Sequence, residues 1–520
     1  RLLEEDRVSP RLLVSDDGRT LAVNVILESA DVDYQRIVTQ IRRSVVGLEA
    51  WVSGVPVFRS DTNLRTVDEI ARFIPLTLLA LACVLWIAFS SWRAVAIPLV
   101  SAGFGTWLLA GALGAFGVPF TLATSMLPSV VLALGCSYAM HLLTAAQGAR
   151  PGSLQERLAP VALPVSLSGL TTAIGFLAMS VVRIDAVREA AVFGALGVLT
   201  VMLATLSLVP AALARWPLGE PRHRTLERIR EVWAPRVLGA AVARPRLLVA
   251  LWGGLLVAVA FGLQDLRVET DVTRWFQTDT PVRKAYEGIR ERLSGISPMN
   301  VVIESTNGHP VTGPEVLERI QAFQDHLASR PRMGRVLSLA DPLGQLHVGF
   351  TGGQDGDLPD RQDLAEQYLL LLESMEEIGD LVTDSRSATN LLLRLDDNGS
   401  RHLLDVAAEA EAWWRAHGAP GFEARTTGVM YEFARASDEI AWGQIRGLSL
   451  ALLAIAAILL AIFRSPRIVA VALVPNAVPV LVAFGSMGLL GIALDAGTVF
   501  IGNLALGIAV DDTMHFVNAY

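Results

Sequence analysis

Two adjacent aspartates near the end of the sequence have the residue types and surroundings for ion or proton chemistry. Asp511 and Asp512 lie in the segment 507–515, GIAVDDTMH, inside the apolar run 499–520. An ionised carboxylate at bilayer depth costs roughly 2.5–3.5 kcal/mol on insertion scales, so such residues persist mainly where they act on ions or protons. The pair predicts a proton site. The alternative is a hydrogen-bonded pair that only joins two helices.

The neighbours of this pair recur at helical spacing. Asn503, Gly507, Asp511 and His515 are four residues apart, so a helix would place them on one face. Gly507 would let a neighbouring backbone approach closely. For His515, a satisfied interior residue is the alternative to a titrating one.

Composition predicts a polytopic membrane protein with a soluble insert. The chain has 520 residues, 52% of them hydrophobic and 18% charged, and a mean hydropathy of +0.45. The net charge of −8 gives no indication of a nucleic-acid partner. Cys83 and Cys136 fall in apolar stretches, so they suggest neither a disulfide framework nor a metal site.

The sequence gives no sign of an enzyme. It carries no nucleophile elbow, phosphate-binding loop or metal-ligand cluster, so we expect no catalytic residue, no metal and no cofactor. Ser137 and His141 would share a helix face, but the orienting acid of a catalytic triad is missing.

Nine apolar stretches, each of about 20 residues, are long enough to cross a hydrocarbon core. They lie at 70–89, 93–116, 120–146, 158–182, 186–214, 246–264, 443–463, 467–493 and 497–520, and are named spans A to I. The connector 215–246 carries eight arginines against three glutamates, so the positive-inside rule places it in the cytoplasm. Within it, Thr225–Trp233 could be an interfacial helix or a solvated linker.

This orientation places two segments, 1–69 and 265–442, together on the extracytoplasmic side. The larger alternates strand signals (300–304, 334–339, 389–395, 422–427) with helix signals (314–328, 363–377, 403–417), which favours two-layer α+β packing. Residues 20–29, 34–47 and 50–57 repeat the last strand–helix–strand portion.

The predicted organisation therefore has six segments. They are the end of a first extracytoplasmic α+β domain (1–69), a five-span bundle (70–214), an arginine-rich cytoplasmic connector (215–245), a span opening the second repeat (246–264), a second α+β domain (265–442) and three further spans (443–520).

The two halves of the chain form a long internal repeat. The stretch from Gly54 resembles the stretch from Gly428 at one constant offset, and the segments 89–93 and 463–467 align at that spacing. Parallel repeats of this kind are a known transporter architecture, with coupling sites near the repeat interface. Spans C and I are therefore expected to pack as counterparts at the centre of the bundle.

The counterparts differ at the acidic pair. Asp511 aligns with Ser137 and Asp512 with Tyr138, while His141 aligns with His515. Only the second repeat keeps carboxylates, and we expect the hydroxyls of the first repeat to donate hydrogen bonds to them. For His141, as for His515, the alternative is a satisfied interior side chain.

With these residues in place, the chain resembles the MMPL, or predicted-exporter, branch of the resistance–nodulation–division (RND) superfamily, which is related to proteins with a sterol-sensing domain. The matching segments are 168–176 (SGLTTAIGF), 475–479 (PNAVP), 487–492 (MGLLGI) and 507–515, with 278–282 (TDTPV) and 338–341 (SLAD) in the soluble part. Asp511 and Asp512 match the family's proton-relay position residue by residue. Many members carry an acid or an Asp-Tyr pair where this chain has Ser137 and Tyr138, so proton stoichiometry stays open.

The resemblance implies an RND fold of twelve spans with two porter domains, in the inner membrane of a bacterium with its large domains in the periplasm. Three spans would then lie outside this sequence, one before Arg1 and two after Tyr520. It also implies proton-driven export of a hydrophobic or amphiphilic substrate, with lipid and protons as ligands. A homo-oligomer and periplasmic or outer-membrane partners are left open.

Two other functions are compatible with the same features. A lipid sensor or scaffold would need the membrane bundle but no proton turnover. An accessory protein for secretion would handle polypeptide instead of lipid. Because fold kinship does not fix cargo, the lipid assignment is an analogy.

Overall fold

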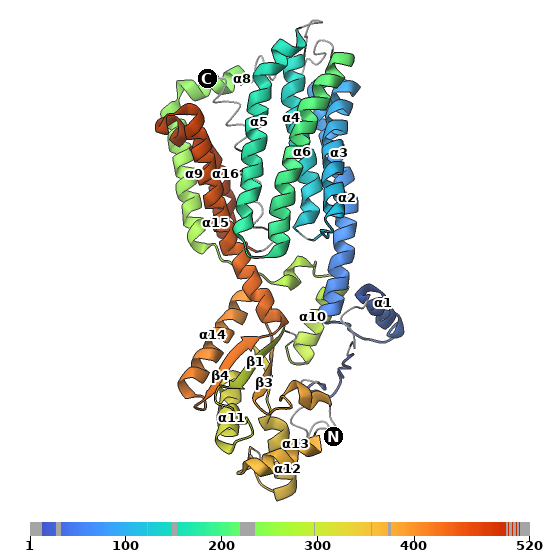
Figure 1. The fold of residues 1–520 in the computed structure, drawn as a ribbon, viewed down its shortest axis with the longest axis vertical. Coiled ribbons are helices and arrows are strands. Elements are labelled where there is room, and N and C mark those ends of the chain that lie inside the picture. Colours follow the sequence, from blue (N-terminus) through green and yellow to red (C-terminus); the bar gives the residue numbers. More distant parts are fainter. Residues whose placement is uncertain are drawn as a thin grey trace. The chain divides into compact units, whose positions relative to one another are not determined.

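The computed structural model describes residues 13–25, 27, 33–121, 123–147, 153–218, 234–295, 297–354, 356–372 and 376–495, with single residues 498, 502, 506 and 509. The chain folds as two compact units (Figure 1). The sheet unit comprises Arg1–Asn63 and Glu269–Asp438, and the helical unit comprises Leu64–Val268 and Glu439–Tyr520.

The sheet unit is built around a four-stranded antiparallel sheet in the order β2-β3-β1-β4. Its strands are β1 (Ser297–Ser305), β2 (Met333–Leu337), β3 (Ala388–Leu395) and β4 (Phe422–Thr427). Helix α11 (Pro314–Ala328) connects β1 to β2, and α14 (Ser400–His417) connects β3 to β4. Each helix thus links two strands that are separated by a third, which is the ferredoxin-like split βαβ arrangement.

Strand register explains the core of this unit. Val301 of β1 pairs with Leu391 of β3, and Met299 pairs with Leu393, so buried residues stand side by side on one face. These residues join one hydrophobic cluster with α11 and α14, in which Phe323 of α11 stacks on Trp413 of α14 at 5.0 Å between ring centroids. The predicted strands and helices in 300–427 are confirmed in type. For the helix predicted over 363–377, the structure describes α13 (Gln362–Leu372) and a 3-10 helix from Glu376, and residues 373–375 lie outside the described residues.

The predicted strand–helix–strand at the start of the chain is correct only for its helix, α1 (Tyr34–Ser44). Residues 50–57 are not a strand, because helix α2 begins at Val55. Gly54, at φ +129°, turns the chain into that helix, and a proline in the first turn favours a helix start. The described part of 20–29 makes only an isolated bridge, Val14 with Leu21, so it has no partner strand to extend along.

The remaining elements of the sheet unit surround these. They are η4 (Val272–Trp275), α10 (Pro281–Arg292), α12 (Ala340–Thr351) and η5 (Glu376–Asp380). Trp51 packs on α10: a Cβ added to Gly288 would come within 2.7 Å of its indole, and the Arg292 guanidinium lies 4.8 Å from the ring centroid.

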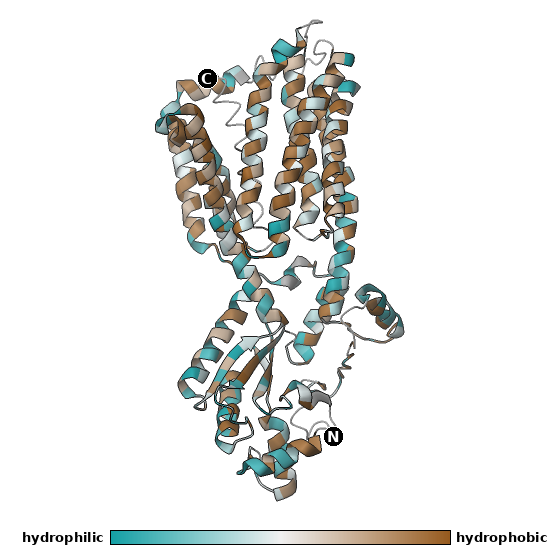
Figure 2. Cartoon of the chain, viewed as in Figure 1, coloured by the Kyte–Doolittle hydropathy of each residue, from teal (hydrophilic) through white to brown (hydrophobic). Residues whose placement is uncertain are grey.

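The helical unit consists of long apolar helices (Figure 2). They are α2 (Val55–Phe89), α3 (Trp92–Ala115), η1 (Thr124–Met126) with α4 (Leu127–Ala146), α5 (Leu154–Ala178) with η2 (Met179–Val181), α6 (Asp185–Arg215), α8 (Ala234–Ala243), α9 (Pro245–Asp265), α15 (Val429–Phe463) and α16 (Pro466–Leu489). The unit boundary falls within α2 and α15. Among the described residues, eight helices are long and apolar enough to cross a membrane, and they correspond to spans A to H.

Several predictions fall outside the described residues. Span I is described only at a few positions, and Thr225–Trp233 is not described at all. The choice between an interfacial helix and a linker for that segment therefore stays open.

Small residues allow the first-repeat helices to pack closely around α6. A Cβ added to Gly105 of α3 would come within 2.7 Å of the Val201 backbone, and one added to Gly197 of α6 would come within 2.9 Å of Leu109 and Val131. Helix α9 approaches α16 in the same manner, with Gly262 against Gly485 and Gly488. Such small-residue contacts bring helix backbones together where lipid supplies no hydrophobic driving force.

The predicted repeat is visible in the helices themselves. α2 and α15 each have 35 residues, and α3 and α16 each have 24. Positive φ angles recur at equivalent places, +67° at both Gly117 and Gly491. The chain is thus a multi-pass helical membrane protein with an α+β insert and two parallel repeats, as the sequence predicts.

Candidate functional site

The structure describes only one half of the predicted relay site. Ser137, Tyr138 and His141 lie on α4. The other half, Asn503, Gly507, Asp511, Asp512 and His515, lies outside the described residues, so its contact with α4 stays a prediction.

Helix α4 runs through the core of the first-repeat bundle and packs against α3, α5 and α6. Tyr138 is fully buried, while Ser137 and His141 are half-buried. Ser137 and His141 are one turn apart and share a face, as predicted from their spacing. Between Arg93 and Arg150 the sequence has no Asp, Glu, Lys or Arg. Helices α3 and α4, which lie in this stretch, therefore provide hydroxyl and imidazole groups but no carboxylate.

The two counterpart helices begin with the same hydrogen-bonded cap. Before α4, the Thr121 backbone N donates to Thr124 Oγ1 at 2.7 Å, and the Thr124 N donates to Thr121 Oγ1 at 3.2 Å. At the start of span I, the Asp495 N donates to Thr498 Oγ1 at 2.9 Å, and the Thr498 N donates to Asp495 Oδ1 at 2.7 Å. Reciprocal side-chain caps satisfy backbone donors that a helix start leaves free.

Described positions of span I show where its first turns pack. A Cβ added to Gly502 would come within 2.6 Å of the Phe484 ring on α16. Leu506 is 1% exposed and joins a cluster with Ile455 of α15 and Ala178 of α5, and its first-repeat counterpart, Leu132, is also buried. Gly502 and Leu506 are therefore interior positions of the helical unit.

The sequence analysis missed a set of buried polar side chains in the helical unit. Ser101 of α3 donates to Thr205 of α6 at 3.5 Å, and Ser168, Thr171 and Thr172 of α5 are all buried. Asn476 of α16, fully buried, donates through Nδ2 to the Ala472 carbonyl at 3.2 Å. The signal for the residues on α5 and α16 was present in the motifs SGLTTAIGF and PNAVP, which were used only as family markers.

Helix α5 also contacts the second repeat. A Cβ added to Gly447 of α15 would come within 3.0 Å of the Ala178 carbonyl, and one added to Gly443 within 2.7 Å of Val182. Helix α5 thus packs on α6, and its C-terminal end and the residues after it meet α15.

The two motifs in the sheet unit have structural roles. Asp341 is almost buried, accepts a hydrogen bond from the Ser338 backbone N at 2.8 Å, and is held by Gln324 at 2.9 Å, so SLAD starts α12. In TDTPV, Pro281 opens α10 and Thr280 Oγ1 donates to the Gln277 carbonyl at 2.7 Å. Both motifs start helices.

Comparison with known proteins gives a consistent result. The model of the MMPL family matches residues 4–248 and 274–511. The probable transport protein MmpL1 of Mycobacterium tuberculosis is 25% identical over 371 residues, and a putative membrane protein of Streptomyces coelicolor is 26% identical over 342 residues. These alignments cover 67% and 60% of this chain, but only 37% and 46% of the relatives' own lengths.

A solved structure shares the fold. The hedgehog release protein Disp from the water bear Hypsibius dujardini superposes with a TM-score of 0.61 at 13% sequence identity. The superposition covers 96% of this chain and 67% of Disp. The family match over most of the sequence shows that the chain belongs to the MMPL family of the RND superfamily, and the superposition shows that it shares its fold with Disp.

Proposed function

We propose that this chain is part of a transporter that exports a hydrophobic or amphiphilic substrate, a membrane lipid by class, and that proton entry at Asp511 and Asp512 drives it. The observation that carries the proposal is the position of α4. Its repeat counterpart in sequence is the span with the acidic pair, and α4 lies in the core of the helical unit with Tyr138 fully buried.

The cap and Leu506 support the same placement for span I. Both counterpart helices start with a reciprocal side-chain cap, and both bury the equivalent leucine. If the repeat continues for one and a half further turns, Asp511 and Asp512 occupy the positions that Ser137 and Tyr138 occupy in α4. The carboxylates would then face protein and not lipid, as membrane-embedded acids generally do.

Two carboxylates side by side interact, so protons bind the pair in coupled macroscopic steps and not to each residue independently. Protonation from the extracytoplasmic side would remove the charge and release the partner groups on α4. One charge moved through 100 mV is worth roughly 2.3 kcal/mol, which is enough to bias a helix rearrangement.

The lipid class of the cargo is an analogy with the family. The relatives' names support transport more generally: MmpL1 is named a probable transport protein, and Disp is named a release protein for hedgehog. The inner membrane of a bacterium as location, the periplasmic side for the sheet unit, and any oligomer or outer-membrane partner belong to the same proposal.

The test uses the intact gene in its native host. Inner- and outer-membrane lipids are compared for wild type, deletion, the double variant Asp511→Asn/Asp512→Asn, and the matched control Asp185→Asn. Asp185 opens α6 with its side chain 88% exposed, so the control removes a carboxylate without touching the relay. We expect the double variant to match the deletion, with one lipid retained in the inner membrane, and the control to match wild type.

A double variant that behaves as wild type would overturn proton coupling and favour the lipid sensor or scaffold. A deletion that changes secreted protein and leaves lipids unaltered would favour the secretion accessory.

A further inference from the structure

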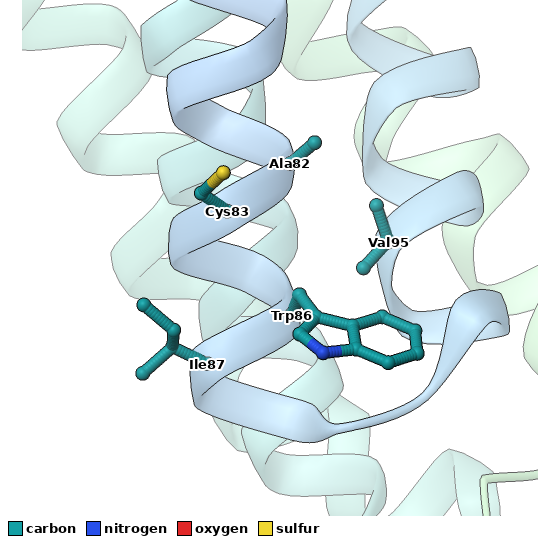
Figure 3. Close-up of a pocket in the computed structure, with 5 residues that line it drawn as sticks. All are labelled: Ala82, Cys83, Trp86, Ile87 and Val95. Carbon is teal, nitrogen blue, oxygen red and sulfur yellow. The ribbon is translucent and has the colours of Figure 1, made fainter.

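A groove on the outer surface of the helical unit has no role in the relay. It lies between α2 and α3, has a volume of about 360 Å³, and is lined by Ala82, Cys83, Trp86, Ile87 and Val95 (Figure 3). Every lining side chain is apolar or a thiol. Trp86 is 53% exposed and Ile87 62% exposed, although both are large and hydrophobic.

The helix that supplies most of this lining is peripheral. Only 6% of the most apolar window of α2 is buried, against 39% for α3 and 56% for α6. In a membrane, such a surface contacts lipid chains. The indole of Trp86 and the side chain of Val95 leave a hollow there instead of a smooth surface (Figure 3).

A positively charged residue, Arg93, lies close to the groove in the sequence. Arg93 is in the first turn of α3, two residues before Val95, and its guanidinium lies 5.8 Å from the Trp92 ring centroid. Within the described residues, no carboxylate pairs with Arg93. The arginine distribution places the α2–α3 turn at the cytoplasmic surface, where tryptophan and arginine mark the headgroup level.

From these features we propose that the α2–α3 groove binds one anionic phospholipid of the cytoplasmic leaflet. One acyl chain lies against Trp86, Ile87 and Cys83, and the headgroup phosphate meets Arg93. The proton pair and the cargo path take no part in this binding, so the lipid site and the transport function can fail independently.

The second repeat supplies a matched control. Arg467 opens α16 where Arg93 opens α3, but the positions equivalent to Cys83, Trp86 and Ile87 carry Ala457, Leu460 and Ala461. The counterpart of Val95, Val469, is 7% exposed and belongs to a packed cluster. The groove lining is therefore specific to the first repeat, whereas the arginine is common to both.

The experiment counts lipids bound to the purified full-length protein by native mass spectrometry, titrating phosphatidylglycerol or phosphatidylcholine. We expect the first phosphatidylglycerol to bind about five-fold more tightly than phosphatidylcholine, the effect of one basic residue near an anionic lipid. Arg93→Gln should remove that preference and Arg467→Gln should keep it. Cys83→Phe, which fills the groove from an exposed position, should weaken the first binding event for both lipids.

Equal binding of the two lipids would overturn the proposal. An equal loss in Arg93→Gln and Arg467→Gln would also overturn it, because general surface charge would then explain the preference. Unchanged binding in Cys83→Phe would place the lipid elsewhere. Thermal unfolding of each variant identifies any that has lost its fold, and Cys83→Leu then replaces Cys83→Phe.

Discussion

The two repeats of the helical unit share helix lengths and turns, and, besides the groove lining, they differ in a glycine contact, in a cap residue and at the predicted relay position. In the second repeat, Gly485 and Gly488 of α16 contact α9, whereas their counterparts on α3, Gly111 and Gly114, would offer an added Cβ no heavy atom of the described chain within 4 Å. The cap before span I has an aspartate where the cap before α4 has a threonine. The relay position carries two carboxylates in one repeat and two hydroxyls in the other.

This comparison shows that the backbone geometry of a repeat does not depend on whether the repeat carries the carboxylates. The elements that set backbone geometry recur with little change, down to φ +47° at Ser90 and +50° at Arg464. At the cap and predicted relay positions, the carboxylates occur only in the second copy. A scaffold duplicated in this way can keep a hydroxyl-bearing helix as the counterpart of an acidic one, which in the proposed function would put hydrogen-bond donors opposite the aspartates.

The largest expected effect is on export, and it differs between the predicted relay positions of the two repeats. We expect Asp511→Asn/Asp512→Asn to abolish export, and Tyr138→Phe to reduce it several-fold, because the phenol would only support a charge that the aspartates provide. Substrate efflux from energised membrane vesicles measures both. If Tyr138→Phe were as severe as the double variant, the two repeats would be equal partners in proton transfer.

The next effect concerns the glycines of α16 that contact α9, and their counterparts on α3. Gly488→Ala should destabilise the protein by about 1–3 kcal/mol, since the new methyl group would overlap the Gly262 carbonyl. Gly114→Ala should be neutral, or more stable by up to about 1 kcal/mol from helix propensity. Thermal unfolding in lipid nanodiscs compares the pair. Equal losses in stability would mean that a neighbouring helix also packs against Gly114 of α3.

How far the sequence predicted this structure depends on the kind of information each feature needs. Apolar length sufficed for eight spans, because hydropathy and backbone satisfaction are local requirements. The strand expected at 50–57 was wrong. Its alternating pattern favoured a strand, but Gly54 and Pro56 favour the start of a helix. The burial of Ser168 and Asn476 depends on which neighbours pack against them, and a single sequence does not contain that.

The predicted site divides in the same way. Helical spacing correctly placed Ser137 and His141 on one face of α4. Alignment of the repeats related them to Asp511 and His515, a relation that the caps and Leu506 support and that only a view of span I could measure. The α2–α3 groove was absent from the prediction, because it arises from the way Trp86 meets a neighbouring helix.

A smaller effect is expected at the caps. Asp495→Ala should cost about 1–2 kcal/mol and Thr121→Ala about 0.5–1 kcal/mol, because each removes a cap and only the aspartate also interacts as an anion with the helix N-terminus. The midpoint of thermal unfolding again measures the difference. A larger loss for Thr121→Ala would contradict the view that the second repeat depends more on charge.

The smallest effect lies in the sheet unit and defines the background for these comparisons. Burial opposes ionisation of Asp397, but the Gly399 backbone N, donating at 2.9 Å, and the Arg332 guanidinium outweigh it, so the pKa of Asp397 lies below its ordinary value. A lowered folded-state pKa stabilises the protein above the ordinary aspartate value of about 3.9, and the stabilisation is lost as pH falls through the folded-state pKa. Asp397→Asn should therefore lower the melting midpoint at pH 6, by the equivalent of at most about 1 kcal/mol, and the loss should shrink as the pH falls below about 3.9. Because this carboxylate belongs to neither membrane repeat, its pH response should be the same in wild type and in the Asp511→Asn/Asp512→Asn variant. A response that vanished with the membrane aspartates would mean that the acid sensitivity of the sheet unit originates in the relay and not in Asp397.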